Sequence, residues 1–172
     1  MKTKEIATIG IFTALMAVIS PIAIPLSGGV DISLATLMVM LIGCLFSPRD
    51  SLIIVSLYIV LAFIGLPVLA GFTGGAGILF GKTGGYVLGY LVLVYCVSKA
   101  AKTDNKPLIF ISMLIGNLLL YTLGTAWFMY VTGINLMMSL TYCVFPFLFT
   151  DFLKCLIVFV IFPKLKKVFV KK

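Results

Sequence analysis

The chain has 172 residues, of which 62% are hydrophobic and only 10% are charged. A soluble domain carries about 25% charged residues, so this composition excludes an ordinary water-soluble fold and predicts an all-α integral membrane domain covering residues 1–172. The net charge of +8 is explained by the lysine bias that orients membrane proteins, rather than by nucleic-acid binding. The absence of histidine excludes Ser-His-Asp and Cys-His catalysis and histidine metal sites.

Charge, glycine and proline divide the chain into six apolar runs. They cover residues 6–25, 32–46, 51–66, 84–98, 107–131 and 141–162. A spanning helix needs about 20 residues, so the first, fifth and sixth runs are long enough and the others lie near the lower limit. We therefore expect six transmembrane helices in a cell membrane.

The basic residues predict the orientation of these helices. If both termini are cytoplasmic, eleven of the thirteen basic residues lie on the inner side or at the chain ends. Lys82 is then outside and Lys154 lies within the sixth run. This asymmetry follows the positive-inside rule, so we expect cytoplasmic termini and an outer loop around Lys82.

The first run contains GIFTALMA, in which Gly10 and Ala14 are small residues four positions apart. Ala17 repeats this spacing one step around the helix, after Thr13. Small residues let another helix approach closely, either within the chain or in a partner subunit.

The loop between the third and fourth runs, residues 65–85, holds eight glycines. Glycine favours open backbone, and lipid leaves exposed amides unpaired, so this segment cannot be a lipid-facing helix. It is expected either to cover a pocket, with amide donors available to a ligand, or to be a tight connector between two helices.

Within this loop, AGILFGKT (residues 76–83) resembles a phosphate-binding P-loop except that Ala76 replaces the first glycine. A P-loop follows a β-strand, opens a helix and faces cytoplasmic nucleotide. Here no strand precedes the segment, no acidic residue is positioned to hold magnesium, and the segment is predicted to lie outside. A membrane ATPase is therefore the disfavoured alternative, and we expect neither catalytic residues nor a bound metal.

The fifth run contains GNLLLYTLGTAW, where Asn117, Tyr121 and Gly124 lie on one helical face. Asn117 is a polar residue deep in an apolar run. It is expected either to face a pocket or to form a hydrogen bond between helices.

The sixth run contains PFLFTDFLK, in which Asp151 and Lys154 are three residues apart on one helical face. Each charge costs about 2.5–3.5 kcal/mol at the centre of a spanning helix, so the two are expected to face inward and pair. An intramembrane charge indicates a functional site by default, and the structural alternative is an ion pair that fixes this helix to its neighbours.

Four segments of the chain resemble the BioY family, the biotin-binding S-components of energy-coupling factor (ECF) transporters. They are GLPVLAGFTGGAGILFGKTGGYVLGY, GNLLLYTLGTAW, PFLFTDFLK and SPRDS. The resemblance runs in the same order from about Gly43 to Lys167. It implies a six-helix membrane bundle that binds biotin near the outer face beneath extracellular loops.

The same resemblance implies partners. Such subunits work with a transmembrane coupling protein and two cytoplasmic ATPases, and they are thought to topple in the bilayer to release biotin inside. The first helix contacts the coupling protein, which would give Gly10, Ala14 and Ala17 a function. Biotin would be a transported ligand and not a cofactor.

The resemblance also assigns binding residues. Asp151 and Lys154 match the pair that holds the ureido ring, and Asn117 is a further candidate on the neighbouring helix. The bicyclic ring and valerate chain would pack on Tyr86, Tyr121 and Phe72. The carboxylate would be bound by loop amides, with Gly74 and Gly75 as candidates, or by Lys82.

Three departures affect the carboxylate end of the expected site. The family commonly has proline where this chain has Lys82, and Phe72 interrupts its usual paired glycines. A Pro-x-Thr-x-Gln pattern is replaced by Asp31, Ser33 and Ala35. An S-component for another vitamin therefore remains the main alternative.

Overall fold

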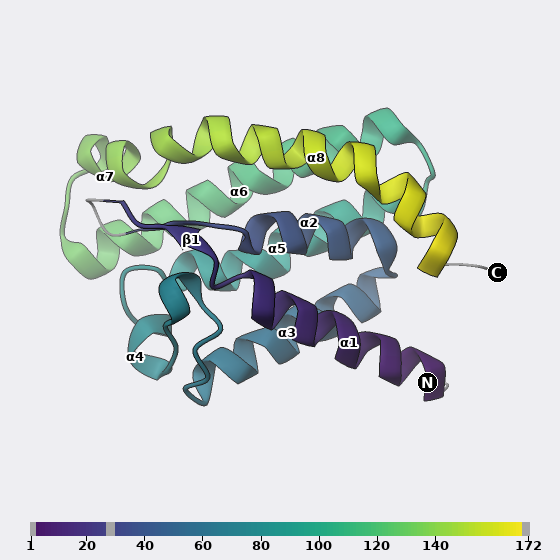
Figure 1. The fold of residues 1–172 in the computed structure, drawn as a ribbon. Helices are drawn as coiled ribbons and strands as arrows, with labels where there is room; N and C mark the ends of the chain where they lie inside the picture. Colours follow the sequence, from purple (N-terminus) through teal and green to yellow (C-terminus); the bar gives the residue numbers. More distant parts are fainter. Residues whose placement is uncertain (1–2, 27–29, 170–172) are drawn as a thin grey trace.

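The computed structural model describes residues 3–26 and 30–169, and its long helices run alternately up and down (Figure 1). These helices are α1 (Thr3–Ile19), α2 (Ala35–Leu45), α3 (Pro48–Phe63), α5 (Gly84–Ala101), α6 (Lys106–Thr132) and α8 (Phe145–Phe169). The start of α1 and the end of α8, the described segments nearest the chain termini, lie at one end of the bundle, called the end with the termini below. The opposite end, called the loop end below, carries the remaining short elements.

The loop end is built from short elements that the apolar runs did not predict. They are β1 (Ala23–Ile24), β2 (Ile32–Ser33), the 3-10 helix η1 (Ala70–Phe72), α4 (Ala76–Leu79) and α7 (Leu136–Cys143). The two strands pair antiparallel. Because the chain turns into this hairpin directly after Ile19, the first helix ends before residue 25, where the apolar run predicted its end.

Local sequence explains where several helices begin and end. The hydroxyl of Ser47 accepts a hydrogen bond from the amide of Asp50, and Pro48 follows at the first helical position of α3. Asn105 caps α6 in the same way. Gly133 ends α6 in the left-handed conformation (φ 71°), which glycine adopts without steric cost.

Helix α5 lies inside the bundle and packs against α2, α3 and α6. Glycines allow the closest of these contacts. A Cβ added at Gly89 would lie 2.6 Å from Cδ1 of Leu120, and one at Gly124 would lie 2.3 Å from the ring of Tyr86. Larger residues at these positions would therefore separate α5 from α6 and move Tyr86, which is part of the site described below.

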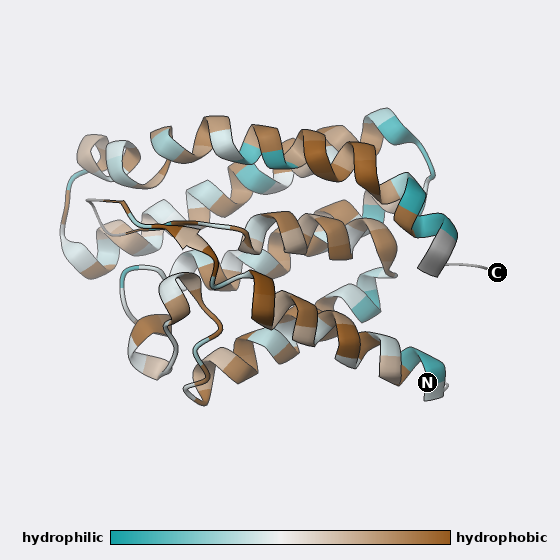
Figure 2. Cartoon of the chain, viewed as in Figure 1, coloured by the Kyte–Doolittle hydropathy of each residue, from teal (hydrophilic) through white to brown (hydrophobic). Residues whose placement is uncertain are grey.

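The outer surface of the bundle is apolar along its middle and polar towards the end with the termini (Figure 2). Among the described residues, three segments are long and apolar enough to cross a membrane: Gly84–Ala101, Lys106–Thr132 and Leu136–Lys167. The shorter apolar helix Ala35–Leu45 lies among them. An all-helical membrane protein is thus confirmed, and the count of six spans stays a prediction.

Candidate functional site

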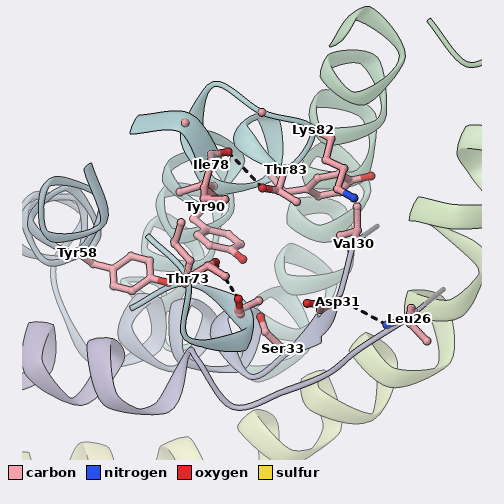
Figure 3. A pocket seen from close by; sticks show the side chains of 16 residues that line it. Leu26, Val30, Asp31, Ser33, Tyr58, Thr73, Ile78, Lys82, Thr83 and Tyr90 are labelled. Carbon is pink, nitrogen blue, oxygen red and sulfur yellow. Dashed lines mark hydrogen bonds between the residues drawn. The ribbon is translucent and has the colours of Figure 1, made fainter. Parts of the chain in front are cut away.

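The loop end contains a cavity of about 520 Å³, called the outer cavity below (Figure 3). Its walls come from the β1–β2 hairpin, the segment around η1, the segment around α4 and the first turns of α5. Beneath it lies a much smaller inner cavity of about 40 Å³, which extends to α6 and α8. The two cavities share Val30, Asp31, Ser33, Tyr86 and Tyr90 as lining residues, so these side chains separate them.

Asp151 and Lys154 line the inner cavity as a buried ion pair, with Nζ of Lys154 2.6 Å from Oδ1 of Asp151. Their side chains are 2% and 8% exposed. The ammonium also donates to the carbonyl oxygen of Ser33 at 2.7 Å and to Oγ1 of Thr36 at 3.0 Å. These three acceptors match the three N–H donors of a lysine ammonium.

The carboxylate of Asp151 is equally well supplied with donors. Thr36 donates its hydroxyl to Oδ1 at 2.9 Å, and Tyr121 donates to Oδ2 at 2.7 Å. The pair therefore connects β2, α2, α6 and α8 through hydrogen bonds made by Ser33, Thr36 and Tyr121. A buried charge pair is tolerated when its remaining groups are hydrogen-bonded in this way.

Three tyrosine side chains line the outer cavity: Tyr58, and Tyr86 and Tyr90, which also separate it from the inner cavity. The hydroxyl of Tyr86 lies 3.0 Å from Oγ1 of Thr125 and donates to the carbonyl of Cys143 at 3.3 Å. Tyr58 donates to the carbonyl of Val68 at 2.9 Å. Because these hydroxyls are engaged by the protein, the rings present mainly apolar surface to the cavity, which suits an apolar ligand body.

Four predicted site residues meet at the inner cavity: Asp151, Lys154, Tyr121 and Tyr86. Lys82 lines the outer cavity only. Sequence reasoning missed Thr36, Tyr58 and Tyr90. Tyr90 follows Tyr86 by one helical turn, and this spacing could have identified it.

Three other predicted site residues line neither cavity. The side chain of Phe72 is 67% exposed, because this residue adopts a left-handed conformation (φ 57°) at the end of η1. Gly74 packs against the backbone of Leu66, and the amide of Gly75 donates to the carbonyl of Ala62 at 2.7 Å. In this arrangement the side chain of Phe72 is thus exposed outside both cavities, and the amide of Gly75 is engaged by the protein, while their roles in binding stay predictions.

Asn117 lies one helical turn before Tyr121 and forms contacts between helices. Its Nδ2 lies 3.5 Å from the sulfur of Met40 and 3.4 Å from the sulfur of Cys155. It lines neither cavity. Of the two alternatives for Asn117, the structure has the interhelical one.

The small residues of α1 do not all share one environment. Gly10 and Ala14 are exposed, and a Cβ added at Gly10 would meet no atom within 4 Å. Ala17 is half-buried and packs against the core. Gly10 and Ala14 thus form an outward face of α1.

The P-loop-like segment does not have P-loop geometry. Residues 76–79 form the single turn α4, and Gly81 accepts a hydrogen bond from the indole N–H of Trp127 at 2.9 Å. The strands in the described part of the chain are the two-residue β1 and β2, and neither precedes this segment directly. The strand–loop–helix arrangement that cradles phosphates is therefore missing from it.

A sequence profile described as the BioY family matches residues 1–171. The chain belongs to the BioY family. It is 35% identical over 159 residues to the protein named biotin transporter BioY2 of Lactococcus lactis subsp. cremoris, covering 91% of this chain and 87% of that relative. It is 31% identical over 171 residues to the biotin transporter BioY of Thermotoga maritima, covering 98% and 99% of the two chains.

A solved structure has the same fold. The crystal structure described as the S-component for biotin from an ECF-type ABC transporter aligns with a TM-score of 0.88 and 28% sequence identity. The alignment covers 97% of this chain and 95% of that chain. The resemblance inferred from the four segments is thereby confirmed over nearly the whole chain.

Proposed function

We propose that this BioY-family chain is the biotin-binding membrane subunit of an ECF-type vitamin uptake transporter and not an enzyme. It captures biotin from outside the cell and releases it to the cytoplasm with energy from partner ATPases. The observation that carries the proposal is the buried, hydrogen-bonded pair of Asp151 and Lys154 beneath a cavity at the loop end.

The chemistry of this pair suits the ureido ring of biotin. Ureido N–H groups are donors that fit the Asp151 carboxylate, and the ureido oxygen fits the Lys154 ammonium. A site built on such hydrogen bonds rejects analogues that lack the matching groups, because its own buried groups would stay unpaired.

The small volume of the inner cavity limits what can bind beside Asp151 and Lys154. An inner cavity of about 40 Å³ has room for water but not for a bicyclic ring. Ring binding therefore requires the wall at Tyr90 and Ser33 to move, and hydrogen bonds from Thr36 or Tyr121 to Asp151 to be exchanged for ligand contacts. Because one set of hydrogen bonds replaces another, the net cost of this exchange is modest.

In the membrane, we propose that six helices cross the bilayer with both termini in the cytoplasm and the loop end outside. Helix α2 has 11 residues and a length of about 16 Å, roughly half of a bilayer core of about 30 Å. The hairpin before α2 continues this path as irregular backbone, which is tolerated where it lines a cavity. A cysteine introduced at Lys82 should react with impermeant reagents added from outside, and labelling from inside alone would contradict this orientation.

The partners of the proposed transporter are a transmembrane coupling protein and two cytoplasmic ATPases. The outward face formed by Gly10 and Ala14 on α1 is the proposed contact with the coupling protein. Gly10→Leu should reduce biotin uptake in cells while leaving biotin binding unchanged, since Gly10 is exposed and a Cβ added there would meet no atom within 4 Å. Loss of binding in this variant would mean that the face serves folding of the subunit itself.

The direct test is biotin binding to the purified full-length chain in detergent. The double variant Asp151→Asn/Lys154→Met should lose biotin affinity by about a hundredfold or more, because it removes both ureido partners. Asp104→Asn/Lys166→Met is the matched control, since it removes an exposed ion pair of the same residue types at the end with the termini.

Retained binding in the first double variant, with both proteins monodisperse and equally helical, would refute the site. Failure of the wild-type chain to bind biotin, with tight binding of another vitamin from a panel, would refute the substrate.

A further inference from the structure

The end with the termini carries a cavity of about 330 Å³, called the lysine cavity below. It lies between the start of α6 and the last turns of α8. It shares no lining residue with the outer or the inner cavity. The lysine cavity is therefore separate from the proposed biotin site.

Cationic side chains line this cavity from two helices. Lys106 is the first residue of α6, and Lys166 and Lys167 lie in the last turn of α8. Asp104, in the turn before α6, also lines the cavity and pairs with Lys166. Within residues 3–26 and 30–169, neither Lys106 nor Lys167 takes part in an ion pair. The lining thus carries an excess of positive charge, which suits an anionic ligand group.

The rest of the lining is apolar. Ile109 and Phe162 reach the cavity from the buried core, and Pro163 lies beside them. A small water-soluble anion would neutralise the lysines but leave this apolar surface in water, which is unfavourable. A ligand that carries negative charge next to hydrocarbon matches both parts of the lining.

The position of the cavity matches the boundary of a bilayer. Lys106 is the first residue of one segment able to cross a membrane, and Lys167 is the last residue of another. Basic pockets between spanning helices at the cytoplasmic surface bind the headgroups of anionic lipids, and this end is cytoplasmic in the proposed orientation. The positive-inside rule explains why lysines gather at one end, but it does not require three of them to line one cavity.

A row of phenylalanine rings, called the aromatic seam below, continues from the cavity along α8. The ring of Phe162 lies 6.1 Å from that of Phe159, which lies 5.4 Å from that of Phe110 on α6. Phe110 in turn lies 6.3 Å from Phe152. Phe152 and Phe162 are ten residues apart, which is about 15 Å of helix and half of a bilayer core of about 30 Å. The seam is therefore about as long as the acyl region of one leaflet, on the apolar middle of the bundle (Figure 2).

We propose that the lysine cavity binds the phosphate headgroup of an anionic glycerophospholipid whose acyl chain lies along the aromatic seam. The phosphate lies between Lys106 and Lys167, while Lys166 stays paired with Asp104. Lysine suits this role because its ammonium acts as a compact point charge on a flexible stem. A lipid held in this way joins the start of α6 to the end of α8, beside the Asp104–Lys166 pair that ties α8 to the turn before α6. The site is independent of biotin binding.

The test measures lipid binding to the purified full-length chain in a neutral detergent by native mass spectrometry. The probes are dioleoyl phosphatidylglycerol, which is anionic, and dioleoyl phosphatidylcholine, which has the same acyl chains and no net charge. The wild-type chain should prefer phosphatidylglycerol by about 25-fold, from about fivefold for each of the two unpaired lysines. Lys106→Gln/Lys167→Gln should abolish this preference, because glutamine keeps a polar side chain and removes the charge.

Lys99→Gln/Lys102→Gln is the matched control. It removes the same number of exposed lysines from the same end of the bundle, at the end of α5, and neither residue lines the lysine cavity. Its lipid preference should equal that of the wild type. Circular dichroism and size-exclusion chromatography should show both double variants to be as helical and as monodisperse as the wild type, since all four lysines are exposed.

Two further variants test the opposing charge and the seam. Asp104→Asn removes the carboxylate that repels the phosphate and should strengthen phosphatidylglycerol binding by about fivefold. Phe152→Ala should weaken both lipids by the same factor, because contact with hydrocarbon does not depend on the headgroup. Phe149→Ala is its control, since Phe149 is also exposed on α8 and forms no ring contact of the seam.

Equal binding of the two lipids by the wild-type chain, or the same loss of preference in both lysine double variants, would overturn the inference. Displacement of phosphatidylglycerol by excess inorganic phosphate would also overturn it, because the site would then recognise phosphate without hydrocarbon. Reduced biotin uptake by Lys106→Gln/Lys167→Gln with an unchanged lipid preference would assign the cavity to a partner protein instead. None of the lipid measurements uses biotin, so failure of the lipid site and failure of the proposed function are distinguishable.

Discussion

Two lysine–aspartate ion pairs in this chain have nearly the same N···O distance but differ in how far their side chains are buried. Lys154 and Asp151 lie 2.6 Å apart with side chains 8% and 2% exposed. Lys166 and Asp104 lie 2.5 Å apart with side chains 31% and 79% exposed. The first pair contacts three other elements of the fold, whereas the second bridges the end of α8 to the turn between α5 and α6.

The difference shows that distance alone says little about what an ion pair does. An exposed pair contributes about 0–1 kcal/mol, because water screens it and two long side chains lose freedom. A buried pair adds little net stability, yet removing one partner costs about 3–5 kcal/mol because the other charge is left uncompensated. A buried pair lining a cavity is therefore better explained by ligand recognition than by stability.

The largest effect is expected when the buried pair is broken on one side. Lys154→Met leaves the Asp151 carboxylate buried without its cation and should lower the free energy of unfolding by about 3–5 kcal/mol. Unfolding in mixed micelles with increasing SDS, followed by circular dichroism, measures this loss. The double variant Asp151→Asn/Lys154→Met should recover part of this lost stability, because no uncompensated charge is left buried. A Lys154→Met variant as stable as the wild type would contradict the burial of the pair.

A smaller effect is expected from the hydroxyl that donates to the buried carboxylate. Tyr121→Phe removes the 2.7 Å hydrogen bond to Asp151 and should destabilise the chain by about 1.5–3 kcal/mol, the range for hydrogen bonds to charged groups. Tyr130→Phe is the matched control, because Tyr130 is 85% exposed. Equal losses in the two variants would mean that the Tyr121 hydroxyl does not support the pair.

The smallest effect is expected at the exposed pair. Asp104→Asn should change the free energy of unfolding by less than about 1 kcal/mol, and the change should shrink further in high salt. The same SDS titration at low and high ionic strength measures both quantities. A loss comparable to that of Lys154→Met would remove the contrast between the two pairs.

The sequence predicted the parts of the site that depend on helical spacing. Asp151 and Lys154 were expected to pair at three residues apart, and Tyr121 was expected to share a face with Asn117. Such relations are local, so periodicity reveals them. The partners Thr36 and Ser33 lie 115 and 121 residues from Asp151 and Lys154, and no local pattern indicates contacts across that separation.

Most of the remaining differences between the sequence-based predictions and the structure lie in segments outside the long helices. Phe72 has a left-handed backbone conformation and an exposed side chain that lines neither cavity, and sequence alone does not predict such a conformation for a residue other than glycine. The run 6–25 was expected to be one span, but its last residues form β1, which begins at Ala23. This strand pairs with β2, a later segment that lies outside the run. Apolar composition alone does not distinguish a continuous helix from a helix followed by a short apolar hairpin.

The hydrogen bond from Trp127 to Gly81 links the intrinsic fluorescence of this chain to the loop at the outer cavity. Trp127 is the single tryptophan of the chain, and it is half-buried on α6 with its indole N–H bonded to the loop that carries Lys82. Any movement of that loop changes the polarity and hydrogen bonding of the indole. Intrinsic tryptophan emission, without an attached dye, therefore reports the state of the outer cavity from one known position in the chain.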